Sequence, residues 1–233
     1  MKYVVSLVVG LLVGVAVTFL LLYFNPFASQ TTLSPLAVSD HEMVTLNYPA
    51  VAAESIAYTN DGESQVDPHP AKVLQLWEGP IDDTTVMVSL LKDSRSEIAG
   101  IGIKFSSKSE TSNIFNAQAN VDSVWHIFLP SRGSLFIQQT ENYWDYLREI
   151  VIPAYWSSGD NWRGQWTRNI TTGPGALGTA RVVGGSGDFE GMESDGVESL
   201  VAKAYSVEKG PVAMTGELTI EIPGVPPATA EDP

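Results

Sequence analysis

The sequence predicts an all-β domain, either an antiparallel barrel or a sandwich, behind a single N-terminal transmembrane helix. Two observations predict this arrangement. Residues 3–24 contain no charged side chain, and most segments beyond residue 70 are short, rich in β-branched residues and separated by Gly/Pro turns. Short strands at such spacing are typical of antiparallel barrels and sandwiches.

The uncharged N-terminal segment is long enough to cross a membrane. As a helix, residues 3–24 would extend roughly 33 Å, which covers the hydrocarbon core of a bilayer. The run is longer than the core of a signal peptide and ends in bulky side chains, which favours an uncleaved anchor. Lys2 precedes it, and the next basic residue is Lys72. The positive-inside rule therefore predicts a cytoplasmic N-terminus and a periplasmic or lumenal domain, with membrane lipid as the partner of residues 3–24.

Composition divides the chain into four parts. We expect an anchor over residues 1–25, a stalk rich in Pro, Ser and Thr over 26–40, a β-domain over 41–223 and a disordered proline-rich tail over 224–233. The chain has 27 acidic and 13 basic residues, a formal charge of −14, which argues against a nucleic-acid partner. It has no cysteine, which excludes disulfides and thiolate chemistry.

Most elements beyond the stalk are predicted as strands. Alternation at period two and flanking turn residues indicate strands over 85–91, 98–105, 124–129 with 134–139, 163–171 with 178–183, and 212–222, the two pairs being hairpins. Two segments differ. Spacings of three and four predict a short helix over 142–151, whereas 197–207 fits either a helix or a strand.

A glycine-rich segment, residues 184–191, is the densest local signal. It fails the spacing of a dinucleotide-binding loop, of a nucleophile elbow and of a calcium loop. A tight irregular turn, with an aromatic residue in the core, fits better. The residues of this predicted structural turn are Gly184, Gly185, Gly187, Phe189 and Gly191.

Residues 182–191, V-V-G-G-S-G-D-F-E-G, followed by Gly196, resemble the G-G-T-G-x-[FY]-x-G-x-x-G element of dirigent proteins and allene oxide cyclases. The resemblance implies a small antiparallel barrel of about eight strands in which the last two strands follow this element, so 197–207 becomes a strand. Ser186 replaces the usual Thr, Gly196 comes two residues late, and residues 141–161 read as an insertion or lid. The resemblance also implies a barrel interior that holds a small hydrophobic molecule, but it transfers no catalytic residue.

Aromatic residues supply the candidate ligand site. Four of the six tryptophans fall between residues 144 and 166, interleaved with arginines and carboxylates. On an alternating strand Trp162, Trp166 and Arg168 share a face, and an inward His126 could act as a general base. Core packing under a lid would explain the same aromatic residues. No metal-ligand or nucleotide motif occurs, so neither a metal nor another cofactor is expected, and catalytic residues stay unassigned.

Three functions remain open. The first is an anchored barrel that binds a small apolar ligand or serves as an accessory module. The second is an isomerase or cyclase of the allene-oxide-cyclase type, and the third is a structural subunit that docks a membrane protein partner. An inward polar pair in a dry pocket would favour the second function. A wholly apolar interior with exposed Trp144 or Trp156 would favour the third.

Overall fold

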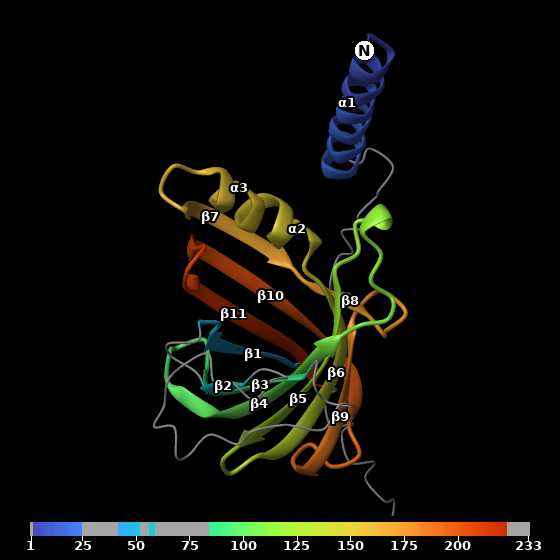
Figure 1. The fold of residues 1–233 in the computed structure, drawn as a ribbon. Helices are drawn as coiled ribbons and strands as arrows, with labels where there is room; N and C mark the ends of the chain where they lie inside the picture. Colours follow the sequence, from blue (N-terminus) through green and yellow to red (C-terminus); the bar gives the residue numbers. More distant parts are fainter. Residues whose placement is uncertain (1, 25–41, 52–55, 59–83, 223–233) are drawn as a thin grey trace, which may run out of the picture.

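The computed structural model describes residues 2–24, 42–51, 56–58 and 84–222 (Figure 1). The predicted stalk and the predicted tail lie outside these residues. The elements are α1 (Lys2–Phe24), β1 (Glu42–Pro49), β2 (Ile56–Tyr58), β3 (Thr84–Lys92), β4 (Ile98–Lys108), the 3₁₀ turn η4 (Ile114–Asn116), β5 (Asn120–Leu129), β6 (Gly133–Asn142), α2 (Trp144–Tyr146), the π-helical turn η5 (Leu147–Val151), α3 (Ile152–Trp156), β7 (Asn161–Asn169), β8 (Thr171–Gly173), β9 (Ala180–Gly187), β10 (Glu193–Ser206) and β11 (Gly210–Ile222).

The strands form one antiparallel, ring-like sheet. Among the described residues, eight strands follow one another in the order β1–β11–β10–β9–β6–β5–β4–β3. A pairing of Asn47 in β1 with Lys92 in β3 closes this path into a ring. The short strand β2 pairs with the same edge of β3. The predicted mostly-β architecture with about eight strands in its main sheet is therefore confirmed.

Several strand predictions hold and one pairing was wrong. Strands β5 and β6 pair as the predicted hairpin, and residues 197–207 fall almost wholly in β10 as a strand. The predicted hairpin of 163–171 with 178–183 does not form, because β7 pairs with β10 and β9 pairs with both β6 and β10. The turn residues between the two segments suggested a local pairing, but β10 is long enough to offer both strands an edge.

Different strands lie between β6 and β10 at the two ends of this part of the sheet. Near the residue-133 end of β6, β9 fills the gap between the two strands. Further along, β8 pairs with β6 while β7 pairs with β10. Ile170, between β7 and β8, joins the two sides: its N–H donates to Glu198 O (2.9 Å) and its carbonyl accepts from Asn142 N (2.8 Å). Among the described strands β7 pairs with β10 alone, and a helical segment lies beside it.

That helical segment, Trp144–Trp156, comprises α2, η5 and α3 and runs alongside β7 (Figure 1). The predicted short helix is present and extends further than expected. Its middle turn is a π-turn, in which Ile152 N–H bonds Leu147 O five residues back. Pro153 follows and has no N–H to donate to an earlier carbonyl, which disfavours a regular α-helical ladder here. Ile150 and Ala154, four residues apart, are buried against the sheet.

Two apolar clusters fill the space that the strands enclose. The lower cluster contains Trp125, Ile137, Phe189 and Leu218 together with other inward residues of the ring. The upper cluster contains Ile150, Trp166, Ile170, Leu200 and Ala202, with the partly buried residues Tyr143, Tyr146, Trp162, Tyr205, Met214 and Ala50 packed against it. The helical segment and β7 thus supply much of the upper cluster.

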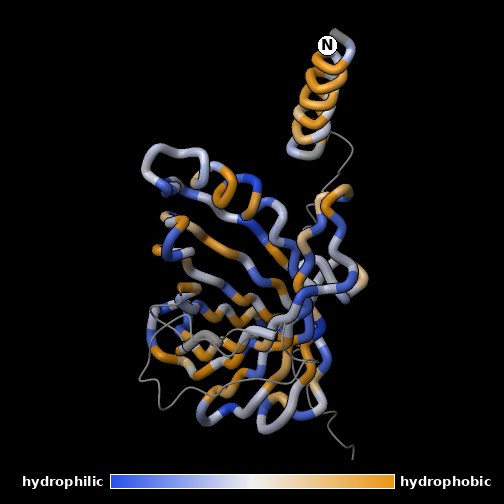
Figure 2. Tube along the Cα trace, in the orientation of Figure 1, coloured by the Kyte–Doolittle hydropathy of each residue, from blue (hydrophilic) through white to orange (hydrophobic). Residues whose placement is uncertain are grey.

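Helix α1 carries no charge from residue 3 to residue 24 and is mostly hydrophobic (Figure 2). Its residues Tyr3–Leu21 form a stretch long and apolar enough to cross a membrane, and none of that stretch is buried against the rest of the chain.

In the glycine-rich segment, Gly184, Gly185 and Gly187 lie in the last part of β9, and residues 188–191 form the turn that follows. Phe189 is fully buried in the lower cluster. Gly187 has a φ of +65°, and a Cβ added there would lie 2.3 Å from Arg132 O. Gly184 lies so close to Phe189 that a Cβ would overlap its carbonyl oxygen. Any side chain at either position must displace backbone.

Gly187 and Gly191 offer a matched test of this turn. Both have positive φ, but a Cβ at Gly191 meets nothing within 4 Å. Gly191→Ala should therefore cost only the backbone penalty of about 1–2 kcal/mol. Gly187→Ala should cost clearly more, and Gly187→Val should leave little folded protein. Thermal unfolding of the full chain in detergent measures both; equal melting temperatures for the two Ala variants would contradict the close approach to Arg132.

Candidate functional site

A cluster of polar side chains lies buried between the two apolar clusters. We call Lys104, Ser123, Gln139, Glu141 and Glu198 the interior polar cluster; all five are buried. They come from β4, β5, β6 and β10, and each occupies an inward position on an alternating strand. Three aromatic donors, Tyr48, Trp125 and Tyr143, complete its hydrogen bonds.

Glu198 is held by four donors. Lys104 Nζ lies 2.7 Å from its Oε1, and the Tyr48 hydroxyl donates to the same oxygen. On the other oxygen, Trp125 Nε1 donates at 3.0 Å, together with Gln139 Nε2. Lys104 also lies 5.4 Å from the centre of the Trp125 ring, within cation–π range.

Glu141 shares the lysine. Lys104 Nζ lies 2.8 Å from its Oε1, which also accepts from Gln139 Nε2 (2.9 Å) and from the Ser123 hydroxyl. Its Oε2 accepts from the Tyr143 hydroxyl at 2.6 Å. Tyr143 packs on the upper cluster, so this oxygen of Glu141 faces the helical segment.

Two inward glycines make room for the aromatic donors. A Cβ at Gly216 would lie 2.0 Å from the Tyr48 ring, and one at Gly102 would lie 2.8 Å from the Trp125 ring. Side chains at these positions would push both rings away from Glu198. The site therefore depends on glycine at position 102 of β4 and at position 216 of β11.

The two carboxylates have opposite pKa shifts. Burial raises the pKa of Glu141, the Lys104 ammonium opposes this and the Glu198 charge adds to the rise, so the pKa ends above its ordinary value. Burial also raises the pKa of Glu198, but the charge of Lys104 and the hydrogen bonds from Lys104, Tyr48 and Trp125 outweigh it, so the pKa lies below its ordinary value. Glu141 is therefore the carboxylate that takes up a proton more readily.

The other members stay in their usual protonation states. Burial lowers the pKa of Lys104, but the charges of Glu141 and Glu198 outweigh it and the pKa is raised. Burial followed by the charge of the neighbouring glutamate raises the pKa of Tyr48 and of Tyr143. Lys104 stays an ammonium and both tyrosines stay neutral, so with both carboxylates ionised the cluster has a net charge of −1.

The structure brings together two of the four predicted ligand residues. Trp162 and Trp166 pack in the upper cluster from one face of β7, as the alternation predicted. Trp166 Nε1 donates to Glu149 Oε2 of the helical segment at 2.9 Å. The Arg168 side chain is 48% exposed. Its guanidinium lies 3.3 Å from Glu149 Oε2, the oxygen that also accepts from Trp166, and 3.9 Å from Asp145 Oδ2. It ties β7 to the helical segment rather than lining the interior.

His126 lies on the outer face of β5, away from the other predicted ligand residues. Its ring stacks on Phe136 at 4.5 Å with an interplanar angle of 11°, and the flanking residues Trp125 and Ile127 point inward. The inward orientation that a general base would need is not found here.

One hydroxyl in the upper cluster lacks a partner among the described residues. The Tyr146 oxygen is buried and makes no hydrogen bond to any described residue. Its ring lies edge-on to Trp166 (5.8 Å) and to Tyr205 (6.1 Å). A buried hydroxyl without a partner is destabilising and calls for an explanation, for which a ligand is one candidate.

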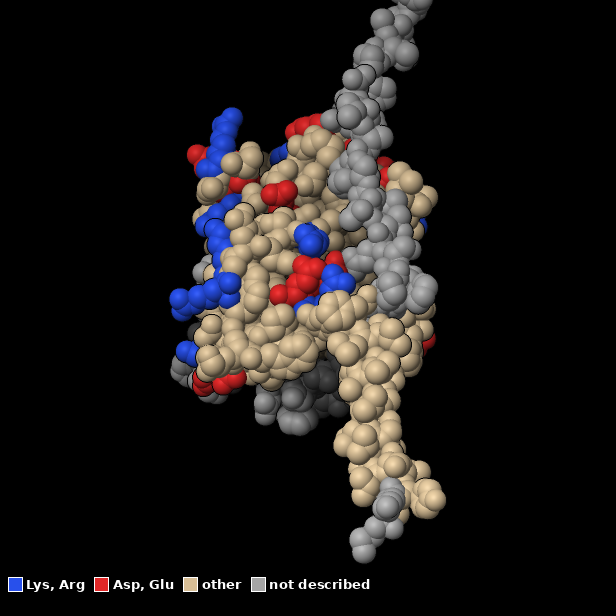
Figure 3. Space-filling view, turned by 90° about the horizontal axis from the view of Figure 1, so that it is seen from above, with Lys and Arg blue, Asp and Glu red and all other residues tan. Residues whose placement is uncertain are grey.

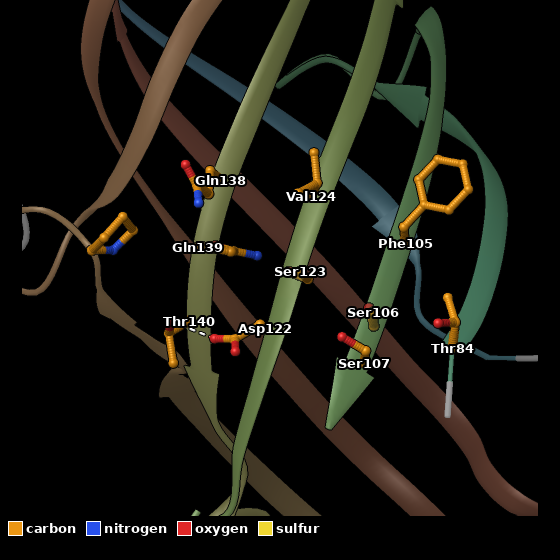
Figure 4. A pocket seen from close by; sticks show the side chains of 11 residues that line it. Thr84, Phe105, Ser106, Ser107, Asp122, Ser123, Val124, Gln138, Gln139 and Thr140 are labelled. Atoms are coloured by element: carbon orange, nitrogen blue, oxygen red, sulfur yellow. Dashed lines mark hydrogen bonds between the residues drawn. The ribbon is translucent and has the colours of Figure 1, made fainter. Parts of the chain in front are cut away.

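A surface hollow of about 220 Å³ lies on the outer face of β4–β6, and Ser123 and Gln139 of the interior polar cluster are among the residues that line it (Figure 4). Exposed Phe105 and Val124 border it. Its one close polar contact among the lining residues joins the Thr140 hydroxyl to Asp122 Oδ1 at 2.8 Å. It holds no buried ionisable group, so we place the candidate site inside the ring.

Sequence reasoning missed most of the interior cluster. Glu141 stood out only as a carboxylate near the aromatic residues, and Lys104 and Glu198 were not singled out. A signal was available: both are lone charged residues at inward positions of alternating strands, within the apolar stretches 101–105 and 197–202. A charge at such a position needs a buried partner.

Comparison with known proteins adds little. No protein-family model matches the chain, and no curated protein matches its sequence. Among solved structures, the chain is similar to AbnU, an exo-specific intermolecular Diels-Alderase, with 15% identity and a TM-score of 0.38 over 78% of this chain and 99% of that one. It is also similar to a nonspecific heme-binding cyclase that catalyses [4 + 2] cycloaddition during neoabyssomicin biosynthesis, with 9% identity and a TM-score of 0.32 over 82% and 74%. At these TM-scores neither similarity assigns a family or a reaction.

The two glutamates should respond differently to substitution by glutamine. In Glu141→Gln the new amide can donate to the Tyr143 hydroxyl, which can accept, so the cost should stay within about 1 kcal/mol. In Glu198→Gln either orientation sets the amide against donor-only groups, Lys104 or Trp125, and the cost should be about 3–5 kcal/mol. Urea unfolding of the full chain in detergent at neutral pH measures both; equal costs would contradict the assigned hydrogen bonds.

The pH dependence of these variants should have opposite signs. The contribution of Glu141 to the free energy of unfolding is fully present below its unfolded pKa of about 4.3 and is lost as the pH rises through its raised folded pKa. The contribution of Glu198 is present above the unfolded pKa and is lost as the pH falls through its lowered folded pKa. From acid to neutral pH, the cost of Glu141→Gln should therefore fall and that of Glu198→Gln should grow. Parallel profiles would contradict the opposite shifts.

Proposed function

We propose that the chain is a membrane-anchored antiparallel β-barrel that binds a small, mostly apolar ligand between its helical segment and the interior polar cluster. The pairing of β1 with β3 supports the barrel. The uncharged helix α1 supports the anchor, and Lys2 at its start supports a cytoplasmic N-terminus with the barrel on the far side. A single observation carries the ligand proposal: an aromatic layer lies directly above a buried, hydrogen-bonded carboxyl.

The chemistry of this layer defines the ligand. Aromatic faces of Tyr143, Tyr146, Trp162, Trp166 and Tyr205 suit a flat or hydrophobic molecule. The Tyr146 hydroxyl would donate to one acceptor on the ligand, such as a carbonyl oxygen. The Tyr143 hydroxyl, which donates to Glu141, would form the polar floor of the site, on the side of the interior polar cluster.

For a ligand to reach the interior polar cluster, the helical segment has to move away from β7; we call it the cover. Glu149 on this segment accepts from Trp166 at 2.9 Å and pairs with Arg168 at 3.3 Å, and both of these residues belong to β7. The cover therefore rests on the carboxylates of Glu149 and Asp145 and on apolar packing. The π-turn within it is a common feature of functional segments. Lifting the cover would leave Tyr143 in place, because its N–H is bonded to Ala119 O at 2.9 Å, and would expose its hydroxyl on Glu141 to a ligand.

An isomerase or cyclase of the allene-oxide-cyclase type is the second candidate. The observation that favours it is the raised pKa of Glu141, caused first by burial, beside the Tyr143 hydroxyl. Such a pair can take a proton from one position of a ligand and return it at another without any external reagent. A structural subunit is a third candidate, favoured by Trp156, which is 76% exposed.

Tyr146→Phe tests ligand binding directly. Because the hydroxyl has no partner among the described residues, its removal should leave stability unchanged or raise it by about 1 kcal/mol. Native mass spectrometry of the full chain, released from a mild detergent without organic extraction, should show a co-purifying apolar mass whose occupancy falls several-fold in this variant. Tyr205→Phe, at the edge of the same cluster, is the control and should keep its occupancy. A well-folded wild-type chain without any such mass would overturn the proposal.

Glu141→Gln separates binding from turnover. The variant keeps the Tyr143 contact and cannot transfer a proton. In a binding protein it should retain the co-purifying mass unchanged. In an isomerase the retained mass should be the same but its chromatographic retention or fragmentation should change, because substrate replaces product. Identical bound molecules in wild type and variant would rule out the enzymatic alternative.

A further inference from the structure

The helical segment exposes large apolar side chains on its outer side. Trp156 is 76% exposed, Tyr155 is 59% exposed and Leu147 is 36% exposed. Together we call these three residues the aromatic patch. Single exposed apolar residues are ordinary, but three within one short segment, two of them aromatic, are typical of an interaction surface.

The end of α1 lies against this segment. The Tyr23 hydroxyl donates to Arg148 O at 3.4 Å, and the Tyr23 ring lies 6.1 Å from that of Trp156. The connection between α1 and β1 does not impose this contact. Residues 25–41 could span up to about 60 Å if fully extended. The contact therefore places the aromatic patch at the level where the apolar helix ends.

Charges around the patch are balanced. Arg148 pairs with Asp145 (3.2 Å) and Glu149 (2.7 Å), and Arg168 approaches the same two carboxylates. The face seen from above carries both signs of charge side by side (Figure 3). With a net charge of −14 on the whole chain, an anionic lipid surface would repel this domain. Zwitterionic headgroups match both observations.

We propose that the aromatic patch lies in the headgroup region of a zwitterionic bilayer beside α1, so that the cover of the barrel faces the membrane and the ligand enters from it. Tyr and Trp favour this depth because one part of each ring is apolar and another forms hydrogen bonds. The inference rests on the membrane anchor of the proposed function. It adds the orientation of the domain and the source of the ligand.

The absence of cysteine allows a direct test in the full chain. In Tyr155→Cys a single thiol carries an environment-sensitive nitrobenzoxadiazole label, and Trp156 remains in place. Glu190→Cys, on the exposed glycine-rich turn, is the matched control (Figure 1). Both chains are reconstituted in phosphatidylcholine vesicles with and without doxyl-labelled lipid. Quenching by doxyl lipid should be several-fold stronger at position 155 than at position 190, with a blue-shifted emission at position 155.

Two further measurements keep the inference separate from the anchor. Trp156→Ser in the Tyr155→Cys background should reduce the quenching several-fold, and adding phosphatidylglycerol should not increase it. If chains that resist alkaline carbonate extraction show equal quenching at positions 155 and 190, the inference is overturned while the anchor is kept. The aromatic patch would then be assigned to a protein partner instead of lipid. Extraction of the chain by carbonate would overturn the anchor itself.

Discussion

The ion pairs of Lys104 with Glu141 and Glu198 are the constraint on which this fold depends. Burying an ion costs several kcal/mol unless a partner and hydrogen bonds compensate it. Here the compensation comes from β4, β6 and β10: Lys104 and Glu141 lie on the two strands that flank β5, whereas Glu198 comes from β10, four strands away from β4 along the sheet. Glu198 gains its lysine only when β10 lies opposite β4. The cluster therefore couples closure of the ring to folding.

The same cluster links the fold to the proposed site. Glu198 is surrounded by donors and is structural, whereas Glu141 shares one oxygen with Tyr143 at the edge of the upper cluster. One carboxylate thus supports the ring while the other borders the aromatic layer. The helical segment covers that layer, and its outer side carries the aromatic patch beside α1.

Local patterns in the sequence predicted the elements better than their partners. Alternation and turn residues identified β3, β4, β11 and the β5–β6 hairpin, and the spacing of Tyr143, Tyr146 and Ile150 identified the helical segment. The partner of β7 was missed because strand pairing is a long-range choice. The interior cluster was missed for a similar reason: Lys104 and Glu198 are 94 residues apart, and only the closed ring brings them together.

The change of partners at Ile170 has an evolutionary consequence. Because β10 pairs with β9 over Glu193–Gly196 and with β7 over Ser199–Ser206, residues 143–169 join the sheet without altering the register of the other strands. We therefore expect this segment to be exchangeable. Its length and side chains can diversify, and with them the molecule that is recognised, while the ion pairs beneath it keep the scaffold intact.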